Sequence, residues 1–209
     1  MQGKHVVVTG GRGALGAGVV TMLEQRGAIV HVPGHEVRLD DEASTVAYYS
    51  GLPALWASIH TVGTFAMTAI AEMSVADFEV QWRTNTLTCF LACREAVKAM
   101  RRSGGGGRIV NVGSRATVTT PGGMTAYVAS KGGLAAFTQS LAAEVLAEGI
   151  LVNAVLPSTI DTPATRASMP KADHATWTTP AAIAEAIAFL ASPANTLTSG
   201  ALVPVYGRA

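Results

Sequence analysis

Three side chains in the middle of the sequence have residue types and a spacing suited to proton transfer: Ser114, Tyr127 and Lys131. Tyr127 and Lys131 are four residues apart, and on a helix this spacing places both on one face. A free tyrosine titrates near ~10, and lowering its pKa by about three units takes roughly 4 kcal/mol, which a neighbouring cation such as Lys131 can supply. Ser114 follows a predicted buried strand, at the carboxyl end where α/β sheets place their ligands.

A glycine-rich segment near the start of the chain predicts a binding site for a dinucleotide. Residues 9–16 read TGGRGALG and follow the apolar segment of residues 5–9 directly. Gly10, Gly13 and Gly16 allow a sharp turn, and the N-terminus of the next helix then presents backbone N–H groups to a pyrophosphate. The alternative, a helix that merely packs closely on a sheet, does not require so many glycines in one turn.

Strands and helices alternate along the rest of the sequence. We predict strands at residues 5–9, 28–32, 54–60, 108–112, 151–156 and 201–205, and helices at 14–26, within 74–100, and at 126–147 and 180–190. Such alternation is typical of a parallel sheet covered by helices on both faces. The predicted fold is therefore α/β, a single domain over residues 1–209 with a Rossmann-type, doubly wound parallel sheet of six or seven strands.

The segment after the second predicted strand is too short for the regular pattern. Only Pro33, Gly34 and His35 separate Val32 from residues 36–39, which also read as a strand. A parallel crossover usually takes a dozen or more residues. Either the crossover helix has been deleted, or residues 36–39 are not a regular neighbouring strand; in both cases the sheet is shortened between its second and third strands.

Composition excludes several classes of partner. Fifteen Lys and Arg against fourteen Asp and Glu give a net charge of +1, so there is no basic field for nucleic acid or an anionic membrane. No run of 18 apolar residues and no leader peptide is visible, so we expect a cytoplasmic protein. Cys89 and Cys93 share a helix face without a third soft ligand near them in the sequence, and we therefore expect no metal site.

Taken together, these motifs resemble the short-chain dehydrogenase/reductase family over nearly the whole chain. Residues 9–16 are similar to its TGxxxGxG turn, with Ala14 in place of the middle glycine, and residues 127–131 (YVASK) match its YxxxK motif. Residues 109–114 (IVNVGS) match the strand that ends in the catalytic serine, and residues 152–157 (VNAVLP) match a later segment. The resemblance implies four catalytic residues, Asn85, Ser114, Tyr127 and Lys131, with Asn85 positioning a water beside the lysine.

The resemblance also implies the cofactor-binding residues. Gly34 stands near the position of the usual acidic residue of the second strand, which selects NAD, while Arg12 and His35 offer positive groups to a 2′-phosphate. We therefore expect NADP in preference to NAD. The expected cofactor-binding set is Gly10, Arg12, Gly13, Ala14, Leu15, Gly16, His35, Asp40, Gly63, Tyr127, Lys131, Pro157, Ile160 and Thr162.

The expected function is hydride transfer between NAD(P) and a small carbonyl or alcohol substrate. Residues 10–16 and 161–173 with Trp177 also resemble quinoid dihydropteridine reductase, so reduction of a C=N or quinonoid substrate is an alternative. A non-catalytic dinucleotide sensor is another. Residues 158–179 are expected to set the substrate, with lining residues among Thr117, Thr119, Thr120, Met124, Met169 and Trp177. The resemblance implies a homodimer or homotetramer that pairs through the two long helices.

Overall fold

The computed structural model describes residues 1–208, and its centre is a six-stranded sheet in which every strand pair is parallel. The strand order is β2-β1-β3-β4-β5-β6. The strands are β1 (His5–Thr9), β2 (Ile29–His31), β3 (Ala57–His60), β4 (Gly107–Val112), β5 (Ile150–Pro157) and β6 (Leu202–Val205). This confirms the predicted α/β class, with six strands.

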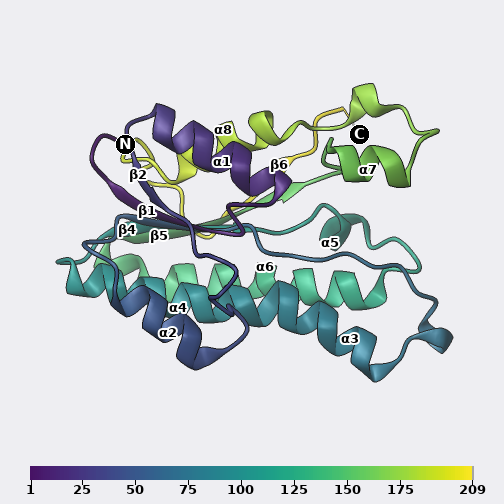
Figure 1. Ribbon diagram of the computed structural model, residues 1–209, viewed down its shortest axis with the longest axis horizontal. Coiled ribbons are helices and arrows are strands. Elements are labelled where there is room, and N and C mark those ends of the chain that lie inside the picture. The colour runs from purple at the N-terminus through teal and green to yellow at the C-terminus, as the bar shows by residue number, and fades with distance from the viewer. Residues whose placement is uncertain (209) are drawn as a thin grey trace.

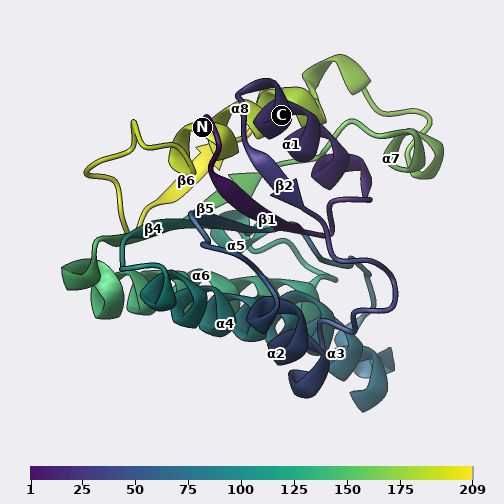
Figure 2. The same cartoon turned by 60° about the vertical axis from the view of Figure 1, so that its left-hand side comes forward.

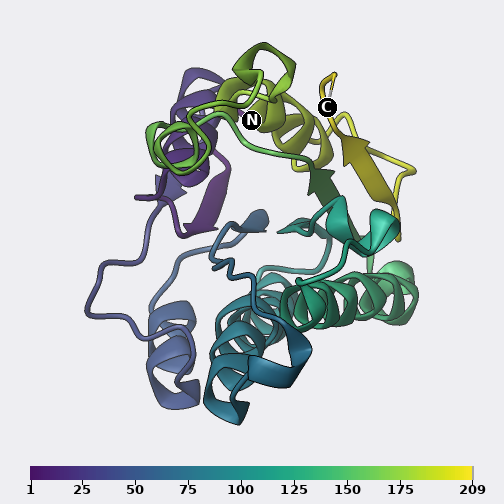
Figure 3. The ribbon, with the colours of Figure 1, turned by 90° about the vertical axis from the view of Figure 1, so that its right-hand side faces the viewer.

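Helices cover both faces of the sheet (Figure 1). One face carries α1 (Ala14–Gln25) and α8 (Pro180–Leu190), and the other carries α2 (Glu42–Ser50), α4 (Thr88–Arg102) and α6 (Thr125–Val145). The view along the sheet in Figure 3 shows the two layers on opposite sides of the strands. Shorter elements complete the chain: η1 (Ile70–Glu72), α3 (Val75–Trp82), α5 (Ala116–Thr119), η3 (Leu146–Glu148), α7 (Pro163–Ser168) and η4 (His174–Thr176).

The two central strands explain why helices cover both faces of the sheet. Every residue of β4 and β5 is buried, because apolar side chains such as Ile109 and Val110 point alternately to opposite faces. Ile109 packs in a core cluster with α4 and α6, and Val110 packs in a second cluster with α1 and α8. Each helical layer therefore closes its own apolar core.

Residues 36–39 are not a strand, which resolves the irregular segment found in the sequence. They form turns and loop, and the chain continues into α2, whose first turn is capped by the side chain of Asp41 (2.9 Å to the Ser44 N–H). Helix α2 packs on α4, on the face opposite α1, as Figure 2 shows. Among the described residues no strand lies beyond β2, so the sheet ends there.

The long helix expected within residues 74–100 is interrupted in the middle. Ser74 caps α3, accepting a hydrogen bond from the Asp77 N–H. Between α3 and α4 a π-helical turn, η2 (Arg83–Leu87), widens the helix and contains the buried Asn85. Such π-turns often accompany functional sites, because they redirect a side chain out of the regular helical register. Across residues 1–208, no helix combines the length and the apolar character that a bilayer crossing needs.

Candidate active site

A cleft of about 770 Å³ lies where the carboxyl ends of the strands meet the loops that follow them. Parallel strands bring their carboxyl ends to one edge of the sheet, which is where α/β proteins bind ligands. Three of the four expected catalytic residues, Ser114, Tyr127 and Lys131, line this cleft. Expected cofactor-binding residues that line it are Leu15, Gly63, Tyr127, Lys131, Pro157, Ile160 and Thr162.

Lys131 lies almost fully buried on α6, with only 4% of its surface exposed. Its Nζ donates a hydrogen bond to the backbone oxygen of Val112, the last residue of β4, over 2.8 Å. Burial lowers the pKa of Lys131 to about 8, and the neighbouring thiol group of Cys89 raises it only in part. Its positive charge is therefore held less firmly than that of an exposed lysine.

Tyr127 lies one helical turn before Lys131, beside Ser114. Burial raises the pKa of Tyr127, and hydrogen bonding with the Ser114 side chain lowers it only in part. Burial is the larger of the two effects, and the lysine Nζ is hydrogen-bonded to Val112. The ring of Phe65 packs edge-on against Tyr127, with the ring centres 5.0 Å apart.

Asn85 does not line the cleft but supports it from behind. Its Oδ1 accepts a hydrogen bond from the Thr64 N–H (2.9 Å), and its Nδ2 donates to the Thr64 carbonyl (3.1 Å) and to the Ser130 hydroxyl (3.0 Å). Asn85 thus joins the loop after β3 to α6. A Cβ at Gly63 would stand 2.9 Å from Asn85 Oδ1 and 3.2 Å from Lys131 Nζ, so only glycine leaves the two groups undisturbed.

The predicted glycine turn has the geometry of a phosphate-binding turn. Gly10 has a φ of +72°, and the Gly13 N–H donates to its carbonyl over 2.9 Å. A side chain at Gly16 would collide with the same carbonyl, so the glycine lets α1 start directly beside the turn. The first turn of α1 has no side-chain cap and no acidic residue. Its N–H groups, with Arg12 and Ala14 in the same turn, are the ones predicted to bind the pyrophosphate of a dinucleotide.

The residues expected at the adenosine end are only partly brought together. Gly11 packs against Val32, which places the glycine turn next to the segment after β2. His35 is exposed on that segment, and Asp40 forms an ion pair with Arg83 over 3.2 Å.

Sequence analysis did not identify Glu36, whose carboxylate folds back over Gly34, where a side chain would collide with it. A negative group therefore lies close to the position where the acidic residue was expected and not found. The sequence signal that could have identified Glu36 is its position two residues after Gly34.

The segment after β5 closes one side of the cleft. Thr162 caps the short helix α7 by accepting from the Thr165 N–H over 3.1 Å, and Pro163 begins that helix. Of the substrate-lining residues suggested from the sequence, Thr119, Met124 and Met169 line the cleft. Thr117, Thr120 and Trp177 are not among its lining residues, and Trp177 packs on the ring of His174 instead, with the centres 4.5 Å apart.

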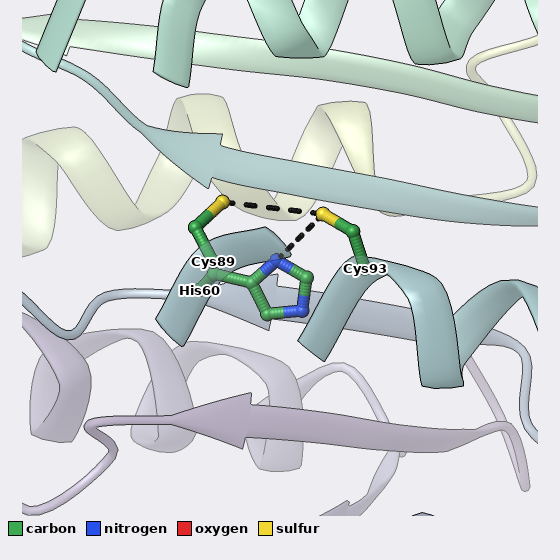
Figure 4. A group of neighbouring side chains, drawn as sticks. All are labelled: His60, Cys89 and Cys93. Carbon is green, nitrogen blue, oxygen red and sulfur yellow. Dashed lines mark hydrogen bonds between the residues drawn. The ribbon is translucent and has the colours of Figure 1, made fainter. Parts of the chain in front are cut away.

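One cluster of chemically active side chains was missed. The expectation that no third soft ligand lies near Cys89 and Cys93 is wrong, because the fold brings His60, at the end of β3, against them (Figure 4). Hydrogen bonding with Cys93 lowers the pKa of the Cys89 thiol, while burial raises that of Cys93.

Comparison with known proteins identifies a family and several relatives of similar length. A family profile described as short chain dehydrogenase matches residues 36–173. A 3-oxoacyl-[acyl-carrier-protein] reductase of Rickettsia felis is 29% identical over 236 aligned positions, covering 99% of this chain and 97% of the relative. A cis-4-hydroxycyclohexanecarboxylate dehydrogenase of Sinomonas cyclohexanicum is 30% identical, covering 96% of this chain and 94% of the relative.

Among solved structures, ElxO with NADP bound superposes with a TM-score of 0.90 at 20% identity, covering 99% of this chain and 98% of that one. The alignments with the two relatives are longer than this chain of 209 residues, so they contain gaps where the relatives carry extra residues. These findings give no support to the expected resemblance to dihydropteridine reductase.

Proposed function

Because this chain belongs to the short-chain dehydrogenase/reductase family and is an NAD(P)-dependent oxidoreductase of that family, we propose that it interconverts a secondary alcohol and a ketone on a small, largely apolar substrate. Ser114, Tyr127 and Lys131 carry the reaction. The cofactor supplies or accepts the hydride when it is bound. The chain's own residues bind the substrate oxygen, move its proton and exclude water.

The observation that carries the proposal is the meeting of these three side chains at one cleft. Ser114 arrives from the end of β4, and Tyr127 and Lys131 from one face of α6. In the reducing direction the Ser114 hydroxyl donates a hydrogen bond to the substrate carbonyl oxygen, and the Tyr127 hydroxyl gives that oxygen a proton. The raised pKa of Tyr127 keeps it protonated at neutral pH, ready to act as the acid.

Lys131 and Asn85 assist the transfer of the proton from Tyr127. Lys131 lies one helical turn from Tyr127, and its ammonium stabilises the phenolate left by proton transfer. Asn85 positions the loop around Gly63 beside that ammonium, through its paired hydrogen bonds with Thr64. We assign Asn85 as a positioning residue. A water held between the residues around Asn85 and Lys131 would return a proton to Tyr127.

The lining of the cleft supports an apolar substrate. Its apolar lining includes Phe65, Met67, Pro121, Met124 and Met169, and Phe65 packs on Tyr127. Methionines adapt their shape to different apolar groups, so this lining favours aliphatic or alicyclic carbonyl compounds over sugars. The two relatives described above, named for a 3-oxoacyl group and a hydroxycyclohexane ring, act on such substrates by their names.

NADP is the cofactor that we propose. Arg12 is exposed in the glycine turn beside the segment after β2, where its guanidinium can reach a 2′-phosphate. The similar fold of ElxO accommodates NADP. Glu36 is the opposing feature, because its carboxylate would repel a phosphate.

We also propose that the protein is a homodimer or homotetramer. Large apolar side chains are exposed along α3 and the start of α4, namely Val75, Phe78, Val80, Trp82 and Phe90. Such a surface is normally covered by another chain. Light scattering at micromolar concentration measures the assembly directly, and a monomer would contradict the proposal.

The experiment that tests the function replaces Tyr127 with Phe. Tyr127→Phe removes one hydroxyl and keeps the ring against Phe65, so NADPH should bind with nearly unchanged affinity in a fluorescence titration. Reduction of a panel of alicyclic and 3-oxoacyl ketones should fall by at least about 10²-fold, the range that general acid catalysis contributes. Undiminished turnover would refute the assignment, and a wild type that binds NADPH but reduces no carbonyl compound would favour a sensor.

A further inference from the structure

His60, Cys89 and Cys93 form a closed cluster between the sheet and α4. His60 is 3% exposed, Cys89 is 4% and Cys93 is 0%. Their potential ligand atoms all lie within 4.8 Å of one another. The two sulfur atoms come from successive turns of α4, and the imidazole reaches them from the end of β3 with its Nδ1 facing Cys93 (Figure 4). The proposed alcohol chemistry uses none of these three side chains.

Two separations within the cluster match the edges of a tetrahedral metal site. A zinc ion about 2.3 Å from each sulfur and about 2.05 Å from the imidazole nitrogen requires the two sulfurs to be roughly 3.8 Å apart, and sulfur and nitrogen roughly 3.6 Å apart. The observed separations are 3.9 Å between Cys89 Sγ and Cys93 Sγ, and 3.4 Å between Cys93 Sγ and His60 Nδ1. Two of the three separations therefore already match ligand spacing, and the third, between Cys89 Sγ and the His60 ring, is no more than 4.8 Å.

Asn111 on β4 provides a fourth oxygen. Its Oδ1 lies 3.5 Å from Cys93 Sγ and 2.7 Å from His60 Nδ1. The first distance matches the edge of roughly 3.6 Å expected between sulfur and oxygen around zinc. The second is a direct hydrogen bond, and it must lengthen by about 0.7 Å for both atoms to bind one ion.

Hydrogen bonds fix the orientation of the imidazole. The Nε2 of His60 bonds with the Ser58 hydroxyl over 2.8 Å, and that hydroxyl bonds with the Tyr49 hydroxyl over 2.9 Å. On the other side, the Nδ2 of Asn111 donates to Thr138 Oγ1 over 2.9 Å, which turns the Asn111 oxygen toward His60. Partners of this kind commonly hold the ligands of a metal in place.

We propose that Cys89, Cys93 and His60, completed by Asn111, are a structural Zn²⁺ site. Zinc with two thiolates, a neutral imidazole and a neutral amide oxygen carries no net charge, so the buried cluster avoids the cost of an uncompensated ion. Binding releases the two thiol protons, while the imidazole proton resides on Nε2 and is donated to Ser58. Because every ligand is buried, the ion enters as the chain folds and the finished site has no open position for a substrate.

Cobalt is the probe for the test, because Co²⁺ in a tetrahedral thiolate site absorbs strongly in the visible and near ultraviolet. The reduced full-length protein is unfolded with a chelator present, transferred to chelator-free buffer, and refolded with Co²⁺. We expect saturation at one Co²⁺ per chain, loss of the absorption when one equivalent of Zn²⁺ is added, and a higher melting temperature with Zn²⁺ than after refolding without metal.

Cys89→Ser and Cys93→Ser should each abolish the charge-transfer band, and His60→Gln should shift or weaken it. His35→Gln, which changes an exposed histidine, is the matched control and should bind one equivalent as the wild type does. If a variant does not fold, the metal-binding measurements on the wild type still test the proposal. Refolded wild type without the tetrahedral spectrum, without one retained equivalent of Zn²⁺ after desalting, or with a signal that persists in Cys89→Ser would overturn the proposal.

Discussion

Lys131 donates its hydrogen bond to the backbone carbonyl of Val112 at a point where the lysine is almost entirely buried. The last residue of β4 therefore fixes the lysine of α6, and the burial that fixes it also lowers its pKa to about 8. The position and the charge of this group are thus set by the same packing of helix on sheet.

Affinity for NADPH should decrease as the pH rises through about 8. A lysine whose pKa is lowered is charged below that value and loses its charge above it, and only the ammonium attracts the cofactor's oxygens. In Lys131→Met the affinity should be about ten- to a hundredfold weaker at pH 7, and its decrease between pH 7 and 9 should disappear. Fluorescence titrations across this range measure both effects.

Lys4→Met provides the control for the lysine experiment. Lys4 precedes β1 at the opposite end of the sheet and lies over the ring of Trp56, so its loss should leave the titration with NADPH and its pH dependence as in the wild type. An affinity for NADPH that does not vary between pH 7 and 9 in the wild type would contradict the assignment.

Gly63→Ala should impair both stability and cofactor binding. The added methyl group would meet Asn85 Oδ1 and Lys131 Nζ, and neither can retreat freely, because each is held by its own hydrogen bonds. We expect a loss of about 1–3 kcal/mol in the free energy of unfolding, as for other overpacked sites, together with weaker NADPH binding. Urea denaturation and fluorescence titration measure the two quantities.

Gly122→Ala is the matched control for Gly63. Gly122 is exposed, and a methyl group there meets nothing within 4 Å, so the stability should stay within about 0.5 kcal/mol of the wild type. Equal effects of the two substitutions would show that the close approach at Gly63 has no special importance.

The parts of this molecule that sequence could predict are those encoded over short distances. The YVASK spacing fixes Tyr127 and Lys131 on one helical face, and the glycine turn must follow β1 immediately to serve α1. Strands β4 and β5 were found because a doubly covered strand is continuously apolar. In each case the information lies within about a dozen consecutive residues.

Contacts across the sheet could not be predicted in this way. His60 and Cys93 are 33 residues apart, and only the pairing of β3 with β4 and the packing of α4 bring them together. Glu36 covers Gly34 because residues 36–39 turn back instead of continuing as a strand. The pKa of Lys131 depends on burial, which spacing does not reveal. The features that the sequence did not predict therefore depend on tertiary contacts rather than on local ones.

Arg12 and Glu36 should have opposite effects on cofactor preference. Arg12→Ala removes the cation of the glycine turn, and NADPH should bind at least about tenfold more weakly, as expected for a lost charge-assisted hydrogen bond, while NADH is little affected. Glu36→Gln removes the repulsion of a 2′-phosphate and should strengthen binding of NADPH relative to NADH. Parallel titrations with both cofactors measure the ratio, and equal changes for NADPH and NADH in either variant would refute the assigned role.

The histidine pair at the edge of the sheet should make stability depend on pH. His5 Nδ1 and His31 Nε2 are 2.9 Å apart on the neighbouring strands β1 and β2, and their rings are stacked. Burial and the charge of His5 lower the pKa of His31 below the value of about 6.5 for an unfolded chain. Below pH 6.5 the unfolded chain therefore binds more protons than the folded one, so stability is fully present above this pH and is lost as the pH falls. Urea denaturation between pH 8 and 5 should show a smaller decrease in His31→Gln than in the wild type, and His35→Gln should decrease as the wild type does; identical slopes for wild type and His31→Gln would exclude the pair as a cause.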